Sequence, residues 1–168
     1  MRLPILTAAI CLSALNAQRG GAPAFEDYPS PGRYHGKPAA PRFDGLGLPD
    51  SKERARESIE LQAEEGPNFA GRFTIAHWSC DTGCFRIVVI ETATGKLFRD
   101  MPFDTLDIGY NHDTEAHRYG GLSFRAASSL LIAEGCFDGG TRPTPDCARR
   151  FYLWDGAQFN LLKSIAIP

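Results

Sequence analysis

The densest group of reactive side chains lies in the segment 111–117. It contains His112, Asp113, Glu115 and His117, which can all bind a divalent metal or transfer protons. Paired ligands on one face of a helix need a separation of three or four residues, and metal sites usually draw a further ligand from elsewhere. This spacing matches no helix-based zinc motif. We therefore predict no metal, no cofactor and no catalytic residue, and keep a hydrolytic or metal-assisted enzyme as an alternative.

A second group of side chains surrounds a short loop between two cysteines. The loop closes between Cys80 and Cys84, and the candidate binding residues are His77, Trp78, Asp81 and Thr82. A disulfide would present these side chains rigidly, which lowers the entropy lost on binding, and an exposed Trp is a common anchor. The other interpretation is that the bridge only braces a turn and that Trp78 packs inside. The C-x-x-x-C spacing between strands disfavours a redox centre.

The N-terminal residues have the pattern of a secretory signal peptide. Arg2 supplies the positive charge, and residues 3–15 form an apolar run shorter than the ~20 residues that span a bilayer as a helix. We predict a signal peptide over 1–17, cleaved after Ala17, with the A-x-A match that ends at Ala24 as the alternative cleavage site. We also predict a periplasmic or secreted location and no membrane span in the mature chain. The net charge of -2 and the scattered Lys and Arg residues disfavour nucleic acid as a partner.

Four cysteines remain once the signal peptide, which contains Cys11, is removed. They are Cys80, Cys84, Cys136 and Cys147. An even number in an exported chain is typical of a disulfide framework. The short separations favour Cys80 with Cys84 and Cys136 with Cys147. Chain-entropy estimates of ~2 and ~3 kcal/mol for these loops, against ~4 kcal/mol for a bridge from Cys80 to Cys136, leave the connectivity open.

The elements that must position these side chains are mainly strands. Residues 18–49 are rich in Gly and Pro and predict an extended or disordered arm, whose aromatic residues could dock it on the domain. Residues 50–168 predict a single disulfide-bonded, β-rich domain. Asp50 begins a capping-box pattern, which predicts a helix over 51–65, and the Gly-Pro pair that follows ends it.

Alternating side chains and turn residues predict about seven strands, joined mostly by hairpins. The expected strands are 71–78, 85–91, 96–99, 122–125, 130–137, 150–154 and 158–165. The first places His77 and Trp78 on opposite faces, and the stretch 101–121 is polar and irregular. The predicted fold class is mainly β (α+β): an antiparallel meander or sandwich, or a strongly bent sheet, with one N-terminal helix against one side.

Four short stretches together resemble a group of small exported bacterial proteins of uncharacterised function. They are Gly66-Pro-Asn-Phe-Ala-Gly71, Trp78-x-Cys80-x-x-x-Cys84, Thr94-Gly-Lys96 and Tyr152-x-Trp154-Asp-Gly156. The likeness covers residues 66–162 and implies a fold and an exported location. It supplies no catalytic residue, and Arg72 and Ser79 stand where that pattern has a His and a Gly.

These patterns favour an exported envelope protein that binds a protein or another envelope component without catalysis. Small secreted β domains commonly display loops for recognition, and the sequence shows no assembled nucleophile, metal set or phosphate loop. A purely structural envelope protein is the third interpretation. The sequence leaves the ligand and the oligomeric state open.

Overall fold

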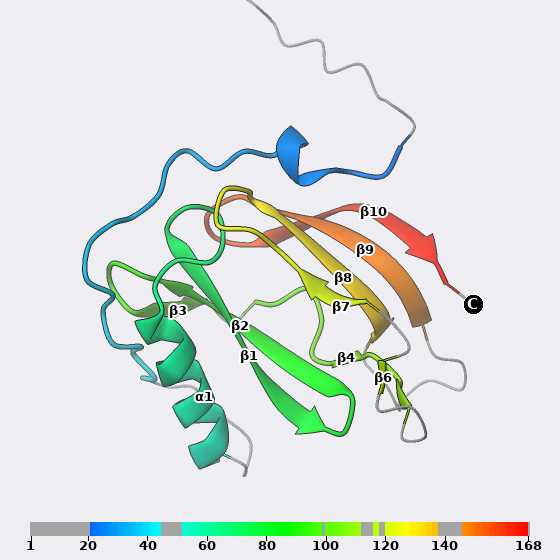
Figure 1. The fold of residues 1–168 in the computed structure, drawn as a ribbon, viewed down its shortest axis with the longest axis horizontal. Coiled ribbons are helices and arrows are strands. Elements are labelled where there is room, and N and C mark those ends of the chain that lie inside the picture. Colours follow the sequence, from blue (N-terminus) through cyan, green and yellow to red (C-terminus); the bar gives the residue numbers. More distant parts are fainter. Residues whose placement is uncertain are drawn as a thin grey trace, which may run out of the picture.

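A computed structural model describes residues 21–44, 52–98, 100–111, 116–117, 120–137 and 146–167. The predicted signal peptide and Asp50 lie outside these residues. The described elements are η1 (Phe25–Asp27), α1 (Lys52–Glu64), β1 (Phe73–Asp81), β2 (Cys84–Glu91), β3 (Lys96–Phe98), β4 (Leu106–Asp107), β5 (Tyr110–Asn111), β6 (Ala116–His117), β7 (Gly121–Ser123), β8 (Leu130–Phe137), β9 (Asp146–Trp154) and β10 (Phe159–Ala166) (Figure 1).

The main sheet contains eight antiparallel strands in the order β1-β2-β4-β8-β9-β10, with β3 also beside β2 and β7 beside β8, while β5 and β6 form a separate pair. The mainly β, antiparallel fold with one helix is confirmed. The prediction of about seven strands is too low. The stretch 101–121, expected to be irregular, contains β4, β5 and β6, whose two residues each are too few for an alternation of side chains to be visible in the sequence.

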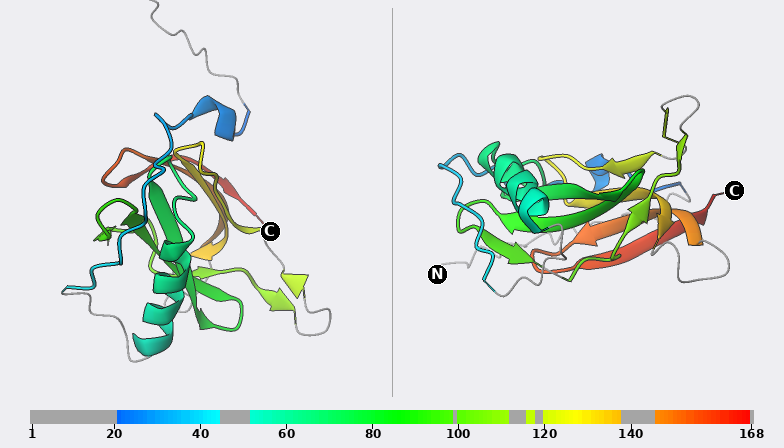
Figure 2. Two further views of the ribbon diagram at one scale, coloured as in Figure 1. Left: turned by 60° about the vertical axis from the view of Figure 1, so that its left-hand side comes forward. Right: turned by 90° about the horizontal axis from the view of Figure 1, so that it is seen from below.

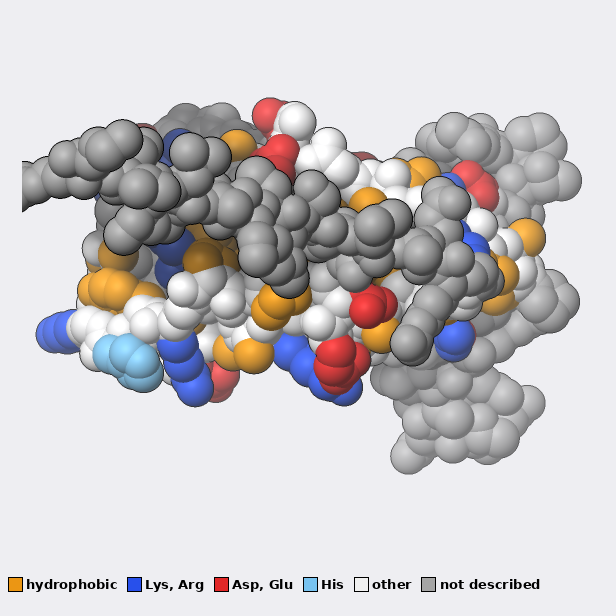
Figure 3. Space-filling model, turned by 90° about the horizontal axis from the view of Figure 1, so that it is seen from above, with side chains coloured by type: hydrophobic (Ala, Val, Ile, Leu, Met, Phe, Trp, Pro, Cys, Tyr) orange, Lys and Arg blue, Asp and Glu red, His pale blue; other side chains and the backbone are white. Residues whose placement is uncertain are grey.

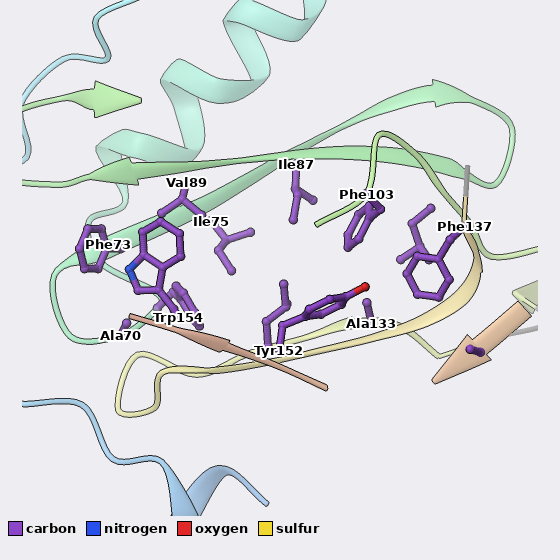
Figure 4. Close-up of a cluster of buried hydrophobic side chains, with 14 of the residues drawn as sticks. Ala70, Phe73, Ile75, Ile87, Val89, Phe103, Ala133, Phe137, Tyr152 and Trp154 are labelled. Carbon is purple, nitrogen blue, oxygen red and sulfur yellow. The ribbon is translucent and has the colours of Figure 1, made fainter. Parts of the chain in front are cut away.

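The sheet is strongly bent, so β8 and β9 lie across from β1 and β2 (Figure 2). Of the architectures expected, the bent sheet is therefore the one observed. The larger core fills the bend with inward side chains of both halves, such as Ile75, Val89, Ala133 and Tyr152 (Figure 4). Leu106 of β4 is fully buried at the corner, where β4 pairs with β2 on one side and β8 on the other. Burial of these apolar side chains is the main contribution to the stability of the fold.

Helix α1 covers the other face of β1 and β2. Its buried residues recur at intervals of four, and Ile59 and Ala63 pack against Ala76 and Val88 of the sheet. The helix predicted over 51–65 is confirmed within the described residues. It ends before Gly66, whose φ of 87° only glycine adopts at low cost.

The free edge of β1 is capped by two amide side chains. Asn68 accepts from the Ile75 N–H at 2.8 Å and donates to the Ile75 carbonyl at 3.0 Å. Gln62 of α1 forms the same pair of bonds with His77, at 3.1 and 2.8 Å. Phe73 is the preceding outward-facing position of β1, two residues before Ile75, and its backbone pairs with the backbone of the turn before the strand. The outward backbone groups at these three positions therefore have partners, and no further strand can add there.

Residues 21–44 form an extended arm that lies along the domain and is held mainly by its backbone (Figure 1). The Tyr34 N–H donates to the Gly71 carbonyl at 2.7 Å, and the Arg42 N–H donates to the Gly95 carbonyl at 2.8 Å. Of the two states expected for this arm, extended and disordered, the described part is extended.

Two glycines give the arm its path. Gly71 and Gly95 have φ of 75° and 69°, in the left-handed region. A Cβ at Gly71 would lie 1.8 Å from the Gly32 carbonyl oxygen, and a Cβ at Gly95 would lie 2.0 Å from the carbonyl oxygen of Ala40. Both positions therefore require glycine twice, for the backbone conformation and for the close approach of the arm.

Candidate functional site

The candidate binding residues lie at the free end of the β1–β2 hairpin. The two strands pair with Ser79 opposite Phe85, and a bulge then allows Asp81 to pair with Cys84. The turn between them has only two residues, and its Gly83 adopts a φ of 74°. The short turn and the bulge together set the register of the hairpin and the direction of its end.

Covalent and hydrogen bonds within this hairpin end hold it in one conformation. The Cys80–Cys84 disulfide joins residues whose Cα atoms are 5.3 Å apart. The Thr82 N–H donates to Asp81 Oδ1 at 2.7 Å, and the Ser79 hydroxyl donates to the Asp81 carbonyl at 2.7 Å. Residues 79–82 are nevertheless exposed. We call these four residues the tip, which is both rigid and accessible.

The structure separates His77 from Trp78, as the alternation along the strand predicts. His77 is exposed at the surface and contacts the Phe85 ring edge to face at a centroid distance of 5.8 Å. Part of its ring is still shielded from water, and this partial desolvation lowers the pKa of His77. Trp78 is half-buried and packs against the cluster under α1, which includes Ile59. Asp81 and Thr82 thus share the tip, His77 borders it on one face of the hairpin, and Trp78 contributes mainly to the packing of the helix.

Sequence reasoning missed two neighbours of the tip. Phe85 supports His77, and Arg86 lies directly opposite Trp78, with Nη2 in an ion pair with Asp104 at 3.2 Å. The predicted hairpin indicated the two strands but not their register. A two-residue turn alone would place Trp78 opposite Ile87, and the bulge between Ser79 and Asp81 shifts the pairing by one residue so that Trp78 lies opposite Arg86.

The two disulfides lie in one transverse row of the sheet. Cys84 is opposite Asp107 of β4, Asp107 is opposite Cys136 of β8, and Cys136 is opposite Cys147 of β9. The bridges are Cys80–Cys84 and Cys136–Cys147, the pairing that the short separations favoured. Each bridge therefore fastens one side of the corner that β4 forms between the two halves of the sheet.

The second group of reactive side chains is placed only in part. His112, Asp113 and Glu115 lie outside the described residues, and His117 is described as a backbone position of β6, opposite Tyr110. Among the described residues, no three His, Cys, Asp or Glu side chains are grouped so that they could hold a metal ion. The described part of the chain also contains no helix long and apolar enough to cross a membrane.

Charged side chains of both signs are interspersed on the face of the molecule seen from above (Figure 3). Several of the arginines are engaged by acids: Arg72 pairs with Glu91, and Arg149 pairs with Glu134. The described part of this face therefore has no large patch of a single charge that could attract a charged partner over a distance.

The fold and the site define a small, disulfide-bonded, antiparallel β protein with a rigid exposed hairpin end. Comparison with known proteins finds no matching family model, no matching curated protein and no matching solved structure. The geometry of the tip is therefore the basis on which a function is inferred.

Proposed function

We propose that the chain is an exported protein of the cell envelope that binds a protein or another envelope component through the tip, without catalysis. The observation that carries this proposal is the combination of rigidity and exposure at the tip. The Cys80–Cys84 bridge and the two hydrogen bonds to Asp81 fix the loop at the surface. A loop that is already ordered loses little conformational entropy when a partner binds. Disulfides of this kind form and persist in oxidising compartments outside the cytosol.

The side chains of the tip indicate what the partner offers. Asp81 supplies a carboxylate, and Thr82 supplies a hydroxyl that can donate or accept. The exposed imidazole of His77, resting on Phe85, adds a ring surface beside them. A matching partner offers an N–H or cationic donor to the carboxylate of Asp81. It also offers an apolar or planar group to the rings of His77 and Phe85.

Site-specific photocrosslinking in intact cells tests the tip. A photoreactive amino acid placed at Thr82 should give an ultraviolet-dependent adduct that mass spectrometry identifies. The matched control is Thr94, an exposed threonine in the β2–β3 turn at the other end of β2. We expect Asp81→Ala to weaken the adduct at Thr82. Equal adducts at both positions, or none at Thr82, would contradict binding through the tip.

Export and the absence of catalysis are tested separately. The protein purified from the envelope fraction should have the intact mass of a chain that begins at Gln18 and holds two disulfides, with a mass that rises on reduction. A full-length chain with free thiols would contradict export. Turnover of a defined substrate that is lost in His112→Ala or His117→Ala would replace the binding function by the enzymatic alternative.

A further inference from the structure

The two end strands of the main sheet, β1 and β10, differ in the protection of their outer edges. The β1 edge is capped by Asn68, Gln62 and the turn before β1. At the other edge, β10 pairs with β9, and no strand lies on its outer side in the part of the chain that the structure describes. Four large hydrophobic side chains are exposed among the described residues, and three of them lie on β10: Leu161 (56%), Leu162 (40%) and Ile165 (38%).

The backbone of β10 presents hydrogen-bonding groups to this open side. The Ile167 N–H donates to the Cys147 carbonyl at 3.2 Å, so Ile167 faces β9. Backbone groups alternate in direction along a strand. The backbone N–H and C=O of Ile165 therefore also point toward β9, while those of Ser164 and Ala166 point outward. An added strand would therefore form its hydrogen bonds with Ser164 and Ala166.

Two features that normally protect an edge do not cover this segment. A lysine on an edge strand discourages pairing, but the Nζ of Lys163 donates to the Gly21 carbonyl of the arm at 3.1 Å. The bulge in β10 lies between Leu161 and Lys163, and from Lys163 to Ala166 the register with β9 is regular. Residues 163–166 thus form a regular, uncovered edge.

We propose that β10 pairs antiparallel with the β10 strand of a second copy of the chain, about a two-fold axis at Ser164. In this register, Ser164 is opposite the partner's Ser164, Lys163 is opposite the partner's Ile165, and Leu162 is opposite the partner's Ala166. The pairing covers Leu162 and Ile165 and keeps the two lysines from facing each other. A two-fold axis at Lys163 would instead place like charges directly opposite, which is destabilising.

A second copy is the occupant that the pair of edges favours. Since the β1 edge is capped from Phe73 to His77, the β10 strand of another copy cannot pair along that part of β1, which disfavours the head-to-tail contact that builds an open filament. Of the two end strands described, β10 is therefore the open one, while β3 and β7, which also have one neighbour each, contain only three residues. A contact between two identical β10 edges closes after two copies. A closed dimer therefore accounts for both the capped edge of β1 and the exposed edge of β10.

A proline substitution tests the pairing without touching the bonds within the chain. Ser164→Pro removes an N–H that faces away from β9, so the β9–β10 ladder keeps its hydrogen bonds. By sedimentation and native mass spectrometry, we expect the wild type and Ser164→Ala to be dimers at micromolar concentration. We expect the dimer dissociation constant of Ser164→Pro to be at least ~10-fold larger, with an unchanged circular dichroism spectrum. A monomeric wild type, or equal dimerisation of a folded Ser164→Pro, would overturn the proposal.

Cysteine crosslinking keeps the proposal testable even when the proline variant fails to fold. Ser164→Cys places two cysteines opposite each other, with Cα atoms ~5.5 Å apart, within the range of a disulfide. Ala166→Cys is the matched control, because the two copies of residue 166 would be four residues, ~13 Å, apart along the strands. We expect a covalent dimer from Ser164→Cys only. Equal crosslinking of the two variants, or a monomer that instead binds an unrelated extended peptide along β10, would rule out the proposed pairing.

Discussion

The side-chain amide of Gln62 forms hydrogen bonds with both backbone groups of His77. Its Oε1 accepts from the His77 N–H at 3.1 Å, and its Nε2 donates to the His77 carbonyl at 2.8 Å. The amide thus takes the place of a neighbouring strand, and it attaches α1 to the edge of β1. Three residues after this attachment, the chain reaches Cys80 and the tip, so Gln62 supports the base of the proposed binding surface.

We expect Gln62→Ala to lower the free energy of unfolding by about 1 kcal/mol, because the His77 N–H loses its partner while the His77 carbonyl keeps the hydrogen bond from the Ser58 hydroxyl. Urea unfolding followed by circular dichroism measures the change. Glu57→Ala, at an exposed position of the same helix, is the control and should change stability little. Equal effects of the two substitutions would show that the amide is not a cap.

Substitution of either Gly71 or Gly95 by alanine should displace the arm. The added Cβ would meet an arm carbonyl oxygen at 1.8 or 2.0 Å, and alanine disfavours the positive φ at both positions. We expect faster proteolysis between residues 21 and 44 and a lower melting temperature. Gly21→Ala is the control, since a Cβ there meets nothing within 4 Å. An arm that stays protected in both variants would contradict this account.

The two disulfides should differ in their contribution to stability. Chain entropy predicts that replacing Cys80 and Cys84 by serine costs ~2 kcal/mol, and that replacing Cys136 and Cys147 costs ~3 kcal/mol, because the second bridge closes the longer loop. Denaturant unfolding of the two double variants measures both values. We expect removal of the first bridge also to reduce crosslinking at Thr82. A variant without that bridge that binds as well as the wild type would separate rigidity from binding.

The stability of the protein should depend on pH through His77. Burial lowers the pKa of His77 in the folded state below its ordinary value of about 6.5. Between these two values the unfolded state holds the proton more tightly, so the contribution of neutral His77 is complete above about pH 6.5 and decreases as the pH falls. We expect the wild type to lose more stability than His77→Gln between about pH 7 and 5. Parallel pH profiles would contradict the expectation.

Elements with a strong repeating pattern were predictable from the sequence. The alternation through Phe73 and His77 placed His77 and Trp78 on opposite faces, and the spacing of Ile59 and Ala63 marked the helix. These patterns are local, because each repeats within one element. The strand β4 was missed since Leu106 and Asp107 alone carry no period, although they join the two halves of the sheet.

Contacts between elements were not predictable in the same way. The caps made by Gln62 and Asn68 depend on how a helix and a turn approach the edge of β1, and no pattern in the sequence reports that approach. The register around the tip was not predictable from the two-residue turn, because the bulge after Ser79 changes which residue of β2 is opposite Trp78. The course of the arm was not predictable either, since its bonds are formed by backbone groups, which every residue carries.

The attachment of the arm also imposes an order on folding. The Ser128 hydroxyl donates to the carbonyl of Phe25, a contact that spans 103 residues, and the Ser30 N–H donates to the carbonyl of Ala127. Residues 21–44 leave the ribosome before nearly all of the groups that hold them have been synthesised. The earliest part of the described chain to be made is therefore among the last to reach its final place, and until then it is open to contacts with other proteins.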